Sequence, residues 1–216
     1  MIRRPPRSTL SSSSAASDVY KRQGLGKART LRHLWQAPFT LHSSIIAAIQ
    51  AEADAARNGG KGRIVAKMNS LVEPEVINAL YEASQAGVMI DLIVRGVCTL
   101  RPGVTGLSEN IRVRSIIGRF LEHHRVMYFY AGGKENVYLS SADWMERNFF
   151  KRIELAFPIL DPKLKKRVIT EGLKFYLADN QQGWEMSSVG AYQRRRSARA
   201  KPHNAQGELM VTLGGS

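Results

Sequence analysis

The sequence contains little cysteine and no long apolar run. Its single cysteine, Cys98, excludes an internal disulfide framework and argues against a thiolate metal cluster. No apolar run reaches the roughly 18–20 residues that a membrane-spanning helix needs, so we expect no membrane insertion. The 216 residues are 44% hydrophobic and 23% charged, as is typical of a globular domain. Together these features favour a reducing, cytoplasmic setting.

Acidic residues are also scarce, with 18 Asp and Glu against 32 Lys and Arg, and the net charge is +14. The segments 1–23 and 190–216 each carry about +4 of this charge, which leaves about +6 for the middle of the chain. A modest positive surplus suits nucleic acid, anionic lipid, nucleotide or another polyanion equally well. Charge therefore indicates an anionic partner without selecting one.

Composition divides the chain into four parts. Residues 1–23 contain a Pro pair and a Ser run without apolar periodicity, which predicts a disordered segment. This segment also resembles a translated sequencing adapter and is not expected to belong to the fold. Residues 24–61 read as a linker and a lead-in helix, 62–180 as the main domain, and 181–216 as a basic tail.

Apolar periodicity predicts alternating helices and strands. A helix over 40–58, with Thr40 as its cap, precedes a strand at 63–68, a second helix from Glu73 and a strand at 88–94. Further elements are expected at 111–117, 125–130, 137–141 and 153–159 (strands) and at 162–177 (helix). The predicted fold class is α/β, with a mixed, largely parallel sheet covered by helices on both faces.

Polar residues follow the predicted strands at the point where each strand ends. Lys67 and Asn69 close the first strand, and Arg95 ends the second. Open α/β sheets build ligand sites at the carboxyl ends of their parallel strands. Guanidinium groups match phosphate oxygens in shape and charge, so Arg95 and Arg152, which opens the last strand, predict a phosphate site.

Two adjacent histidines, His123 and His124, lie just before the strand at 125–130. A histidine in such a place is most often structural, but its imidazole titrates near neutrality and can also exchange protons. Neighbouring side chains of an extended segment point to opposite sides, so only one of the two can face the phosphate site. The sequence leaves open which one does.

Ser140, Ser141 and Asp143 follow the strand at 137–141. Their hydroxyl and carboxylate groups would lie at the same edge as the other candidates. The alternative for Asp143 is a plain helical ion pair with Arg147, which lies four residues further on.

Three long runs together resemble a known family: VAKMNSLVEPEVINALYEASQAGVMIDLIVRG, LRPGVTGLSENIRVRSIIGRFLEHHRVMYF and VYLSSADWMERNFFKRIELAFPI. They are similar, in order and with family-like spacing, to the C-terminal catalytic domain of bacterial polyphosphate kinases over residues 33–178. The resemblance implies a phospholipase D-like fold, in which two similar halves face each other across one active site. It also identifies 62–180 as this catalytic domain.

The resemblance implies one half-site of that superfamily, formed by a histidine, a lysine two residues on, and a Ser-rich strand end with Asn or Asp. His123 matches the histidine, Arg125 stands where the lysine would be, and SSAD at 140–143 matches the strand end. Arg125, Ser141 and Asp143 would then support the site. The arginine in place of lysine departs from the lipid-hydrolysing members and agrees with the kinases.

The family transfers the terminal phosphoryl group of ATP to inorganic polyphosphate, reversibly and with Mg²⁺, through a phosphohistidine in the preceding domain. The resemblance implies that His123 is a general acid/base and that Arg95 and Arg152 bind phosphate. Lys67 and Asn69 are expected as further ATP or phosphate contacts because they lie at the carboxyl end of the first strand. The resemblance assigns no metal ligand to this chain, so the Mg²⁺ ligands are expected elsewhere.

The family also has an N-terminal domain, a head domain and the nucleophile-bearing domain upstream. The isolated chain is therefore expected to be inactive. The full-length enzyme is expected to bind ATP or ADP and polyphosphate as a homo-oligomer in the cytoplasm, with membrane association as an alternative.

Two other functions stay open. The first is a phospholipase D-like nuclease or hydrolase half-site acting as a dimer, which Arg125 in the lysine position disfavours. The second is a non-enzymatic domain that binds polyanions or nucleic acid, which the net charge and the run Arg194–Arg196 favour. A solvated basic tail explains that run equally well.

Overall fold

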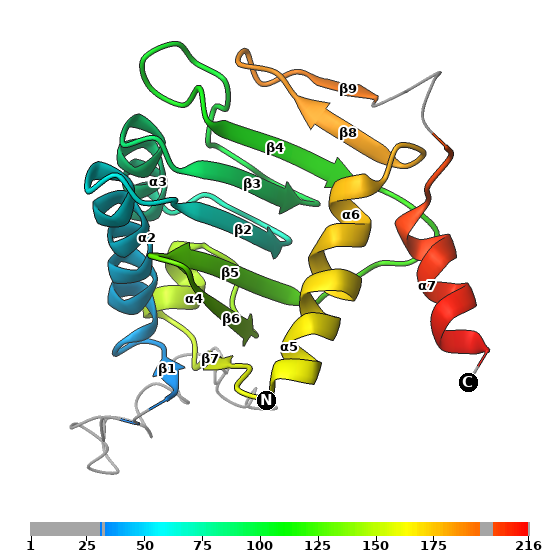
Figure 1. The fold of residues 1–216 in the computed structure, drawn as a ribbon, viewed down its shortest axis with the longest axis horizontal. Coiled ribbons are helices and arrows are strands. Elements are labelled where there is room, and N and C mark those ends of the chain that lie inside the picture. The colour runs from blue at the N-terminus through cyan, green and yellow to red at the C-terminus, as the bar shows by residue number, and fades with distance from the viewer. Residues whose placement is uncertain (1–30, 32, 195–200, 216) are drawn as a thin grey trace, which may run out of the picture. The chain divides into compact units, whose positions relative to one another are not determined.

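The computed structural model describes residue 31, residues 33–194 and residues 201–215. Within them, one nine-stranded sheet runs in the order β1-β7-β6-β5-β2-β3-β4-β8-β9 and carries helices on both faces (Figure 1). The strands are β1 (Trp35–Gln36), β2 (Arg63–Met68), β3 (Met89–Val94), β4 (Ile111–Ile116), β5 (Arg125–Ala131), β6 (Lys134–Ser140), β7 (Leu155–Pro158), β8 (Gly183–Met186) and β9 (Tyr192–Arg194). The helices are α2 (Leu41–Arg57), α3 (Pro74–Gln85), α4 (Glu146–Phe150), α5 (Pro162–Ile169), the π-helix η1 (Thr170–Lys174), α6 (Phe175–Ala178) and α7 (Ala205–Gly214).

The predicted α/β class and mixed sheet are confirmed, but the parallel part of the sheet is smaller than predicted. Only the β2–β3 and β3–β4 pairs are parallel within the described residues, and the other neighbouring strands are antiparallel. One of the antiparallel pairs is the hairpin between β5 and β6. Gly132 and Gly133 form its two-residue turn with φ of 59° and 85°, a conformation that glycine adopts without strain.

The lead-in helix is confirmed as α2, and the second predicted helix as α3. Thr40 precedes α2, but its hydroxyl accepts a hydrogen bond from the Gln36 amide (3.0 Å) and does not cap the helix. Glu73 caps α3 instead, because its carboxylate accepts from the Val76 amide (2.7 Å). Pro74 then occupies the first turn, where its missing N–H costs nothing.

Each face of the sheet has its own apolar core. Helices α2 and α3 pack on one face through Leu41, Ile45, Ile49, Val76 and Leu80, all of them buried. The predicted helix at 162–177 is the run α5–η1–α6, and it covers part of the other face. Gly172 lets this run approach β5 closely, since a Cβ there would lie 3.3 Å from Val126 Cγ2.

The segment 181–216 differs from the predicted basic tail. It contains β8, which pairs with β4, then β9, and finally α7, whose first residues Ala205 and Gln206 are buried. Strands of four and three residues are too short to show an apolar period, and α7 is held by distant residues, so no local pattern predicts them. The segment 1–23 and the residues Arg195, Arg196 and Arg199 lie outside the described residues. In the described part, no helix combines the length and apolar character of a membrane span.

Candidate phosphate site at the carboxyl ends of two parallel strands

Arg95 and Asn69 meet where β3 and β2 end, as the strand-end argument predicts. The Arg95 Nε and Nη2 atoms donate hydrogen bonds to Asn69 Oδ1 (2.9 and 2.5 Å), and Nη1 donates to the Glu122 carbonyl (2.8 Å). These three bonds fix the plane of a half-buried guanidinium group, which carries a positive charge. Such a rigid cation at a strand edge is suited to a phosphate ligand.

Asp143 ties the end of β2 to the start of β5. Its buried Oδ1 accepts hydrogen bonds from the amides of Asn69 (2.7 Å) and Ser70 (3.2 Å), and its Oδ2 accepts from Arg125 Nη2 (2.9 Å). The carboxylate therefore pairs with Arg125 and not with Arg147 on the short helix α4. This arrangement gives Asp143 a role in holding the edge together.

The two histidines have different surroundings. The His123 side chain is exposed, while its carbonyl accepts from Arg125 Nη1 (2.7 Å). The carbonyl just before it, that of Glu122, accepts from Arg95. The backbone at His123 is thus held by an arginine on each side, with its imidazole open to solvent. His124 is also exposed as a residue, but its ring lies 2.8 Å from Lys67 Nζ and packs near the Tyr176 ring.

Lys67 belongs to a second group of contacting side chains, which we name the Glu122 cluster: Lys67, Glu122, His124, Tyr176 and Gln206. The Glu122 carboxylate accepts from the Lys67 ammonium, from the Tyr176 hydroxyl (2.7 Å) and from Gln206 Nε2 (2.9 Å). Burial lowers the pKa of Lys67 to about 8, against the opposing effect of Glu122. Burial alone would raise the pKa of Glu122, but Lys67 holds it below its ordinary value. Lys67 is therefore paired inside the cluster.

The Glu122 cluster predicts a pH dependence of stability. Desolvation of the imidazole, whose ring packs against Tyr176, lowers the pKa of His124 to about 4 together with the neighbouring Lys67 ammonium, although Glu122 works in the other direction. A histidine in the unfolded chain has a pKa of about 6.5. Between that pH and the lower pKa of folded His124, the unfolded chain therefore binds one more proton than the folded chain. The free energy of unfolding should therefore decrease as the pH falls from about 6.5 towards 4.

This dependence can be measured by urea unfolding at several pH values between 7 and 4.5. The variant His124→Asn keeps a hydrogen-bond acceptor for Lys67 but cannot titrate, so its stability should change less with pH. Equal slopes for the variant and the wild type would contradict the expected neutral His124.

Ser141 contacts the buried carboxylate of Glu154, a residue that the sequence did not single out. The Ser141 hydroxyl donates to Glu154 Oε2, and Asn148 Nδ2 donates to Glu154 Oε1 (2.7 Å). Arg152 is exposed two residues earlier and makes no hydrogen bond or ion pair with any described residue. The structure thus brings together Arg95, Asn69, Arg125, Asp143 and the His123 backbone, and leaves Arg152 unengaged.

The important residues that sequence reasoning missed are Glu122, Glu154, Tyr176 and Gln206. The sequence could have indicated Glu122, because this residue directly precedes His123 in the run LEHH. No local pattern could have indicated Tyr176 and Gln206, since their contacts with Glu122 span 54 and 84 residues of sequence. Gln206 also lies in the segment predicted to be a tail.

The described part of the chain holds no set of side chains suited to bind Mg²⁺. No group of three or more His, Cys, Asp or Glu side chains gathers there in a way that could hold a metal ion. The three carboxylates near the site, Glu122, Asp143 and Glu154, are each occupied by hydrogen bonds or an ion pair. These residues do not fit Mg²⁺.

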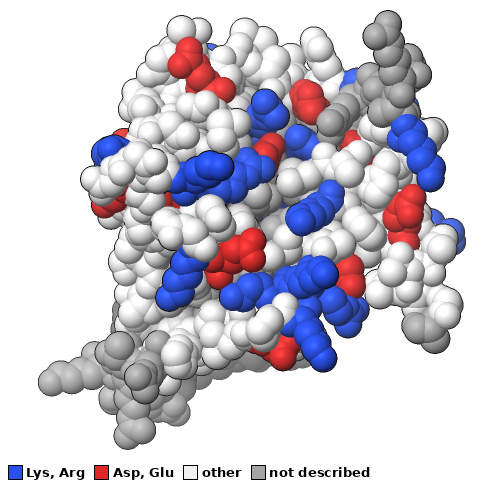
Figure 2. Space-filling view, viewed as in Figure 1, with Lys and Arg blue, Asp and Glu red and all other residues white. Residues whose placement is uncertain are grey.

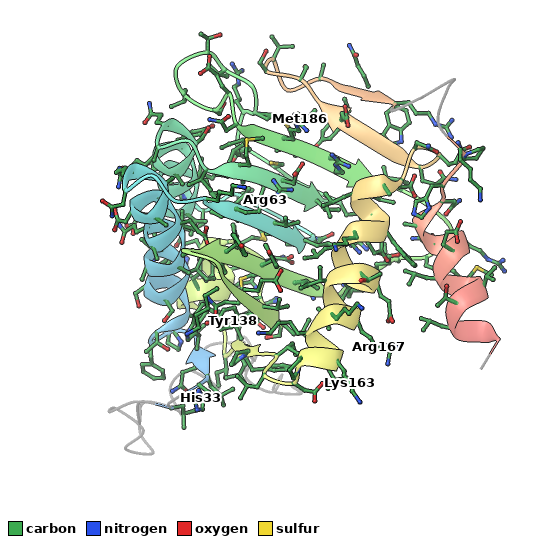
Figure 3. The ribbon with its side chains drawn as sticks, in the orientation of Figure 1. His33, Arg63, Tyr138, Lys163, Arg167 and Met186 are labelled. Carbon is green, nitrogen blue, oxygen red and sulfur yellow. The ribbon has the colours of Figure 1, made fainter. Side chains whose placement is uncertain are left out.

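Lys and Arg side chains gather on the face that carries α5. Figure 2 shows groups of Lys and Arg side chains on this face, with single acidic residues among them. Helix α5 alone contributes Lys163, Lys165, Lys166 and Arg167. Lys163 and Arg167 point away from the sheet in Figure 3, and both are exposed. A surface with this many cations attracts polyanions.

Solved structures share this arrangement of strands and helices. The structure of a phospholipase D family member, Nuc from Salmonella typhimurium, covers 72% of this chain and is itself covered over 97% of its length. The TM-score is 0.51 at 17% sequence identity, so the likeness concerns the fold alone. The chain therefore has a phospholipase D-like fold.

The chain belongs to the family described as polyphosphate kinase C-terminal domain 2, whose model matches residues 34–206. It is 65% identical over 187 residues to the polyphosphate kinase of Paraburkholderia phytofirmans and 66% identical over 188 residues to that of Burkholderia cenocepacia. Each match covers 87% of this chain and 27% of the relative, so the chain spans about a quarter of their length. The crystal structure of polyphosphate kinase from Porphyromonas gingivalis matches with a TM-score of 0.83 at 39% identity, over 92% of this chain and 31% of that one.

Proposed function

We propose that this chain is the C-terminal catalytic part of a polyphosphate kinase, which transfers the terminal phosphoryl group of ATP reversibly to inorganic polyphosphate. One observation carries the proposal: the Arg95 guanidinium is fixed by three hydrogen bonds, one of them to the backbone beside the exposed His123. A rigid cation and an accessible imidazole at one strand edge are the two groups that such a transfer needs from this chain.

The chemistry divides between this chain and the upstream region. A histidine upstream attacks the terminal phosphorus of ATP, and ADP leaves. The phosphohistidine then passes its phosphoryl group to an oxygen of the terminal phosphate of the polyphosphate chain, which frees the histidine again. Such transfers depend mainly on positioning and on neutralising the charge of the phosphoryl oxygens, which Arg95 provides here. His123 exchanges the proton of the attacking or departing group as a general acid/base. The sheet edge that carries Arg95 is stabilised by Asn69, Arg125, Ser141 and Asp143.

Mg²⁺ is expected to accompany the nucleotide, with its protein ligands outside the described residues. Lys67 and Arg152 contribute differently from Arg95. Lys67 acts from within the Glu122 cluster, while the exposed Arg152 is free to contact ATP or polyphosphate. The upstream N-terminal, head and nucleophile-bearing domains complete the site, and the full-length enzyme acts as a cytoplasmic homo-oligomer.

The proposal is tested by comparing two proteins. The first is the 216-residue chain, and the second is the same chain joined to the upstream region of the Paraburkholderia phytofirmans relative. We expect polyphosphate formation from ATP only in the joined protein, measured as the loss of ATP and the growth of acid-insoluble phosphate. Steady synthesis by the short chain would show that the nucleophile has been misplaced, and an inactive joined protein would overturn the proposed function.

Arg95 gives a second test that does not need the upstream region. The variant Arg95→Ala should weaken the binding of inorganic tripolyphosphate to the 216-residue chain by about 10- to 100-fold, because a charge-assisted bidentate contact is lost. Isothermal titration calorimetry at low salt measures this. Arg112→Ala is the control, since Arg112 is an exposed arginine on β4. Equal losses for both variants would mean that tripolyphosphate responds only to net charge.

A further inference from the structure

The loop 117–124, which connects β4 to β5 and carries His123, is held by a side chain from the C-terminal helix α7. The Phe120 amide donates to Gln206 Oε1 (2.9 Å), and Gln206 Nε2 donates back to the Phe120 carbonyl (3.0 Å). The same Nε2 atom donates to Glu122 Oε1 (2.9 Å). One amide group therefore holds both the backbone at Phe120 and the carboxylate that directly precedes His123.

Little apolar packing holds the loop. Its other contacts are polar: the Ile117 amide donates to the Gln182 carbonyl (3.3 Å), and Glu122 is bonded to Lys67, Tyr176 and Arg95. The apolar side chains of the loop are largely exposed, with Ile117 at 57%, Phe120 at 47% and Leu121 at 73%. An exposed connection of this kind is ordinarily mobile because little buried apolar area restrains it. The hydrogen bonds from Gln206 therefore matter more here than they would inside a strand.

Gln206 is itself buried and held in position by its neighbours. It is only 6% exposed, and the residue before it, Ala205, donates its amide to Asp179 Oδ2 just after α6 (2.8 Å). Gly118 makes room for it, because a Cβ at that position would overlap the Gln206 amide group. The start of α7 is thus anchored to α6 on one side and fitted against the loop on the other.

We propose that Gln206 is a positioning residue for His123, acting through Phe120 and Glu122. Glu122 is bonded through its carboxylate to Gln206 and through its carbonyl to Arg95, so the loop has one fixed position relative to the phosphate-binding arginine. The C-terminal helix then forms part of the active site without touching the substrate. This inference rests on the proposed function of His123 and Arg95.

The first test measures the order of the loop in the 216-residue chain by ¹⁵N relaxation. In Gln206→Ala, the order parameters of the amides from Phe120 to His123 should fall from about 0.85 to below about 0.6. Val211 lies on the same helix and is 77% exposed, so in the control Val211→Ala the order parameters should stay unchanged. Unchanged values in Gln206→Ala would overturn the inference.

A second variant guards against a general loss of folding. Gln206→Glu keeps the length of the side chain and its acceptor for the Phe120 amide, but it loses both donated bonds and places a second carboxylate next to Glu122. The loop should become mobile in this variant too, while the amides of β2 and β3 keep their order parameters. A loop as rigid as in the wild type would again contradict the role of Gln206.

The enzymatic test uses the chain joined to its upstream region. Gln206→Ala should lower kcat on the order of 10²-fold and leave KM for ATP within about twofold, as expected when a proton-transfer group is misplaced by about 1 Å. In a His123→Ala background the same substitution should cost less than about twofold, because the group that it positions is already missing. If the fold-losses of kcat in the two single variants multiplied in the double variant, Gln206 would act independently of His123. If the joined wild type were inactive, the proposed function would fail, and the relaxation data would still decide whether Gln206 holds the loop.

Discussion

His123→Ala, in the chain joined to its upstream region, is expected to lower kcat for polyphosphate synthesis by about 10²- to 10⁴-fold, the usual contribution of a general acid/base. The exposed imidazole has no hydrogen bond to another described side chain, so its removal should leave the free energy of unfolding nearly unchanged. Loss of activity with retained stability is therefore the expected combination. Steady-state rates and urea unfolding of the same preparation measure both.

Two variants sharpen this experiment. His33→Ala removes another exposed histidine, at the start of the described fold, and should keep the wild-type kcat (Figure 3). His124→Ala disturbs the Glu122 cluster and should cost stability, with a smaller loss of kcat than His123→Ala. If His124→Ala had the larger effect on kcat, the general acid/base would have to be assigned to His124.

Asp143→Ala is expected to cause the largest loss of stability, about 3–5 kcal/mol, because it leaves a partly buried arginine and two backbone donors without their acceptor. The lost acceptor serves Arg125 and the amides of Asn69 and Ser70, whose strand carries the site. Urea unfolding followed by far-ultraviolet circular dichroism gives the difference in the free energy of unfolding.

Two matched changes separate the possible causes. Asp143→Asn keeps an oxygen for the two amides and loses only the ion pair, so it should cost clearly less than the alanine variant. Asp54→Ala removes an exposed carboxylate paired with Arg57 on α2, and it should cost less than about 1 kcal/mol. An Asp143→Ala variant as stable as Asp54→Ala would show that the buried carboxylate does not hold the edge.

Much of the fold could be predicted because its central elements carry strong local patterns. The strand β2 was predicted with its observed bounds, and α2 differs by one residue at each end, since apolar period and turn residues agree there. The proportion of antiparallel pairs could not be predicted, because strand order depends on contacts between distant segments. The strands β8 and β9 and the helix α7 escaped prediction for the same reason.

The candidate site, too, contains some features that local sequence predicts and others that depend on contacts between distant segments. Residues at strand ends, such as Arg95 and Asn69, could be placed together because the carboxyl ends of parallel strands share one edge. The partner of Asp143 was not predictable, since its ion pair with Arg125 forms across the sheet edge and not along a helix. The pairing of Lys67 with Glu122 joins β2 to a loop 55 residues away, which no periodic pattern indicates.

The two outermost strands of the sheet have a consequence for assembly. In the described part of the chain, β1 has two residues and β9 has three, so each border of the sheet presents very few free backbone groups. Borders this short resist the strand-to-strand association that leads to aggregation. Neighbouring domains of a polyphosphate kinase are therefore expected to dock on this unit through side chains and loops, and not by prolonging its sheet.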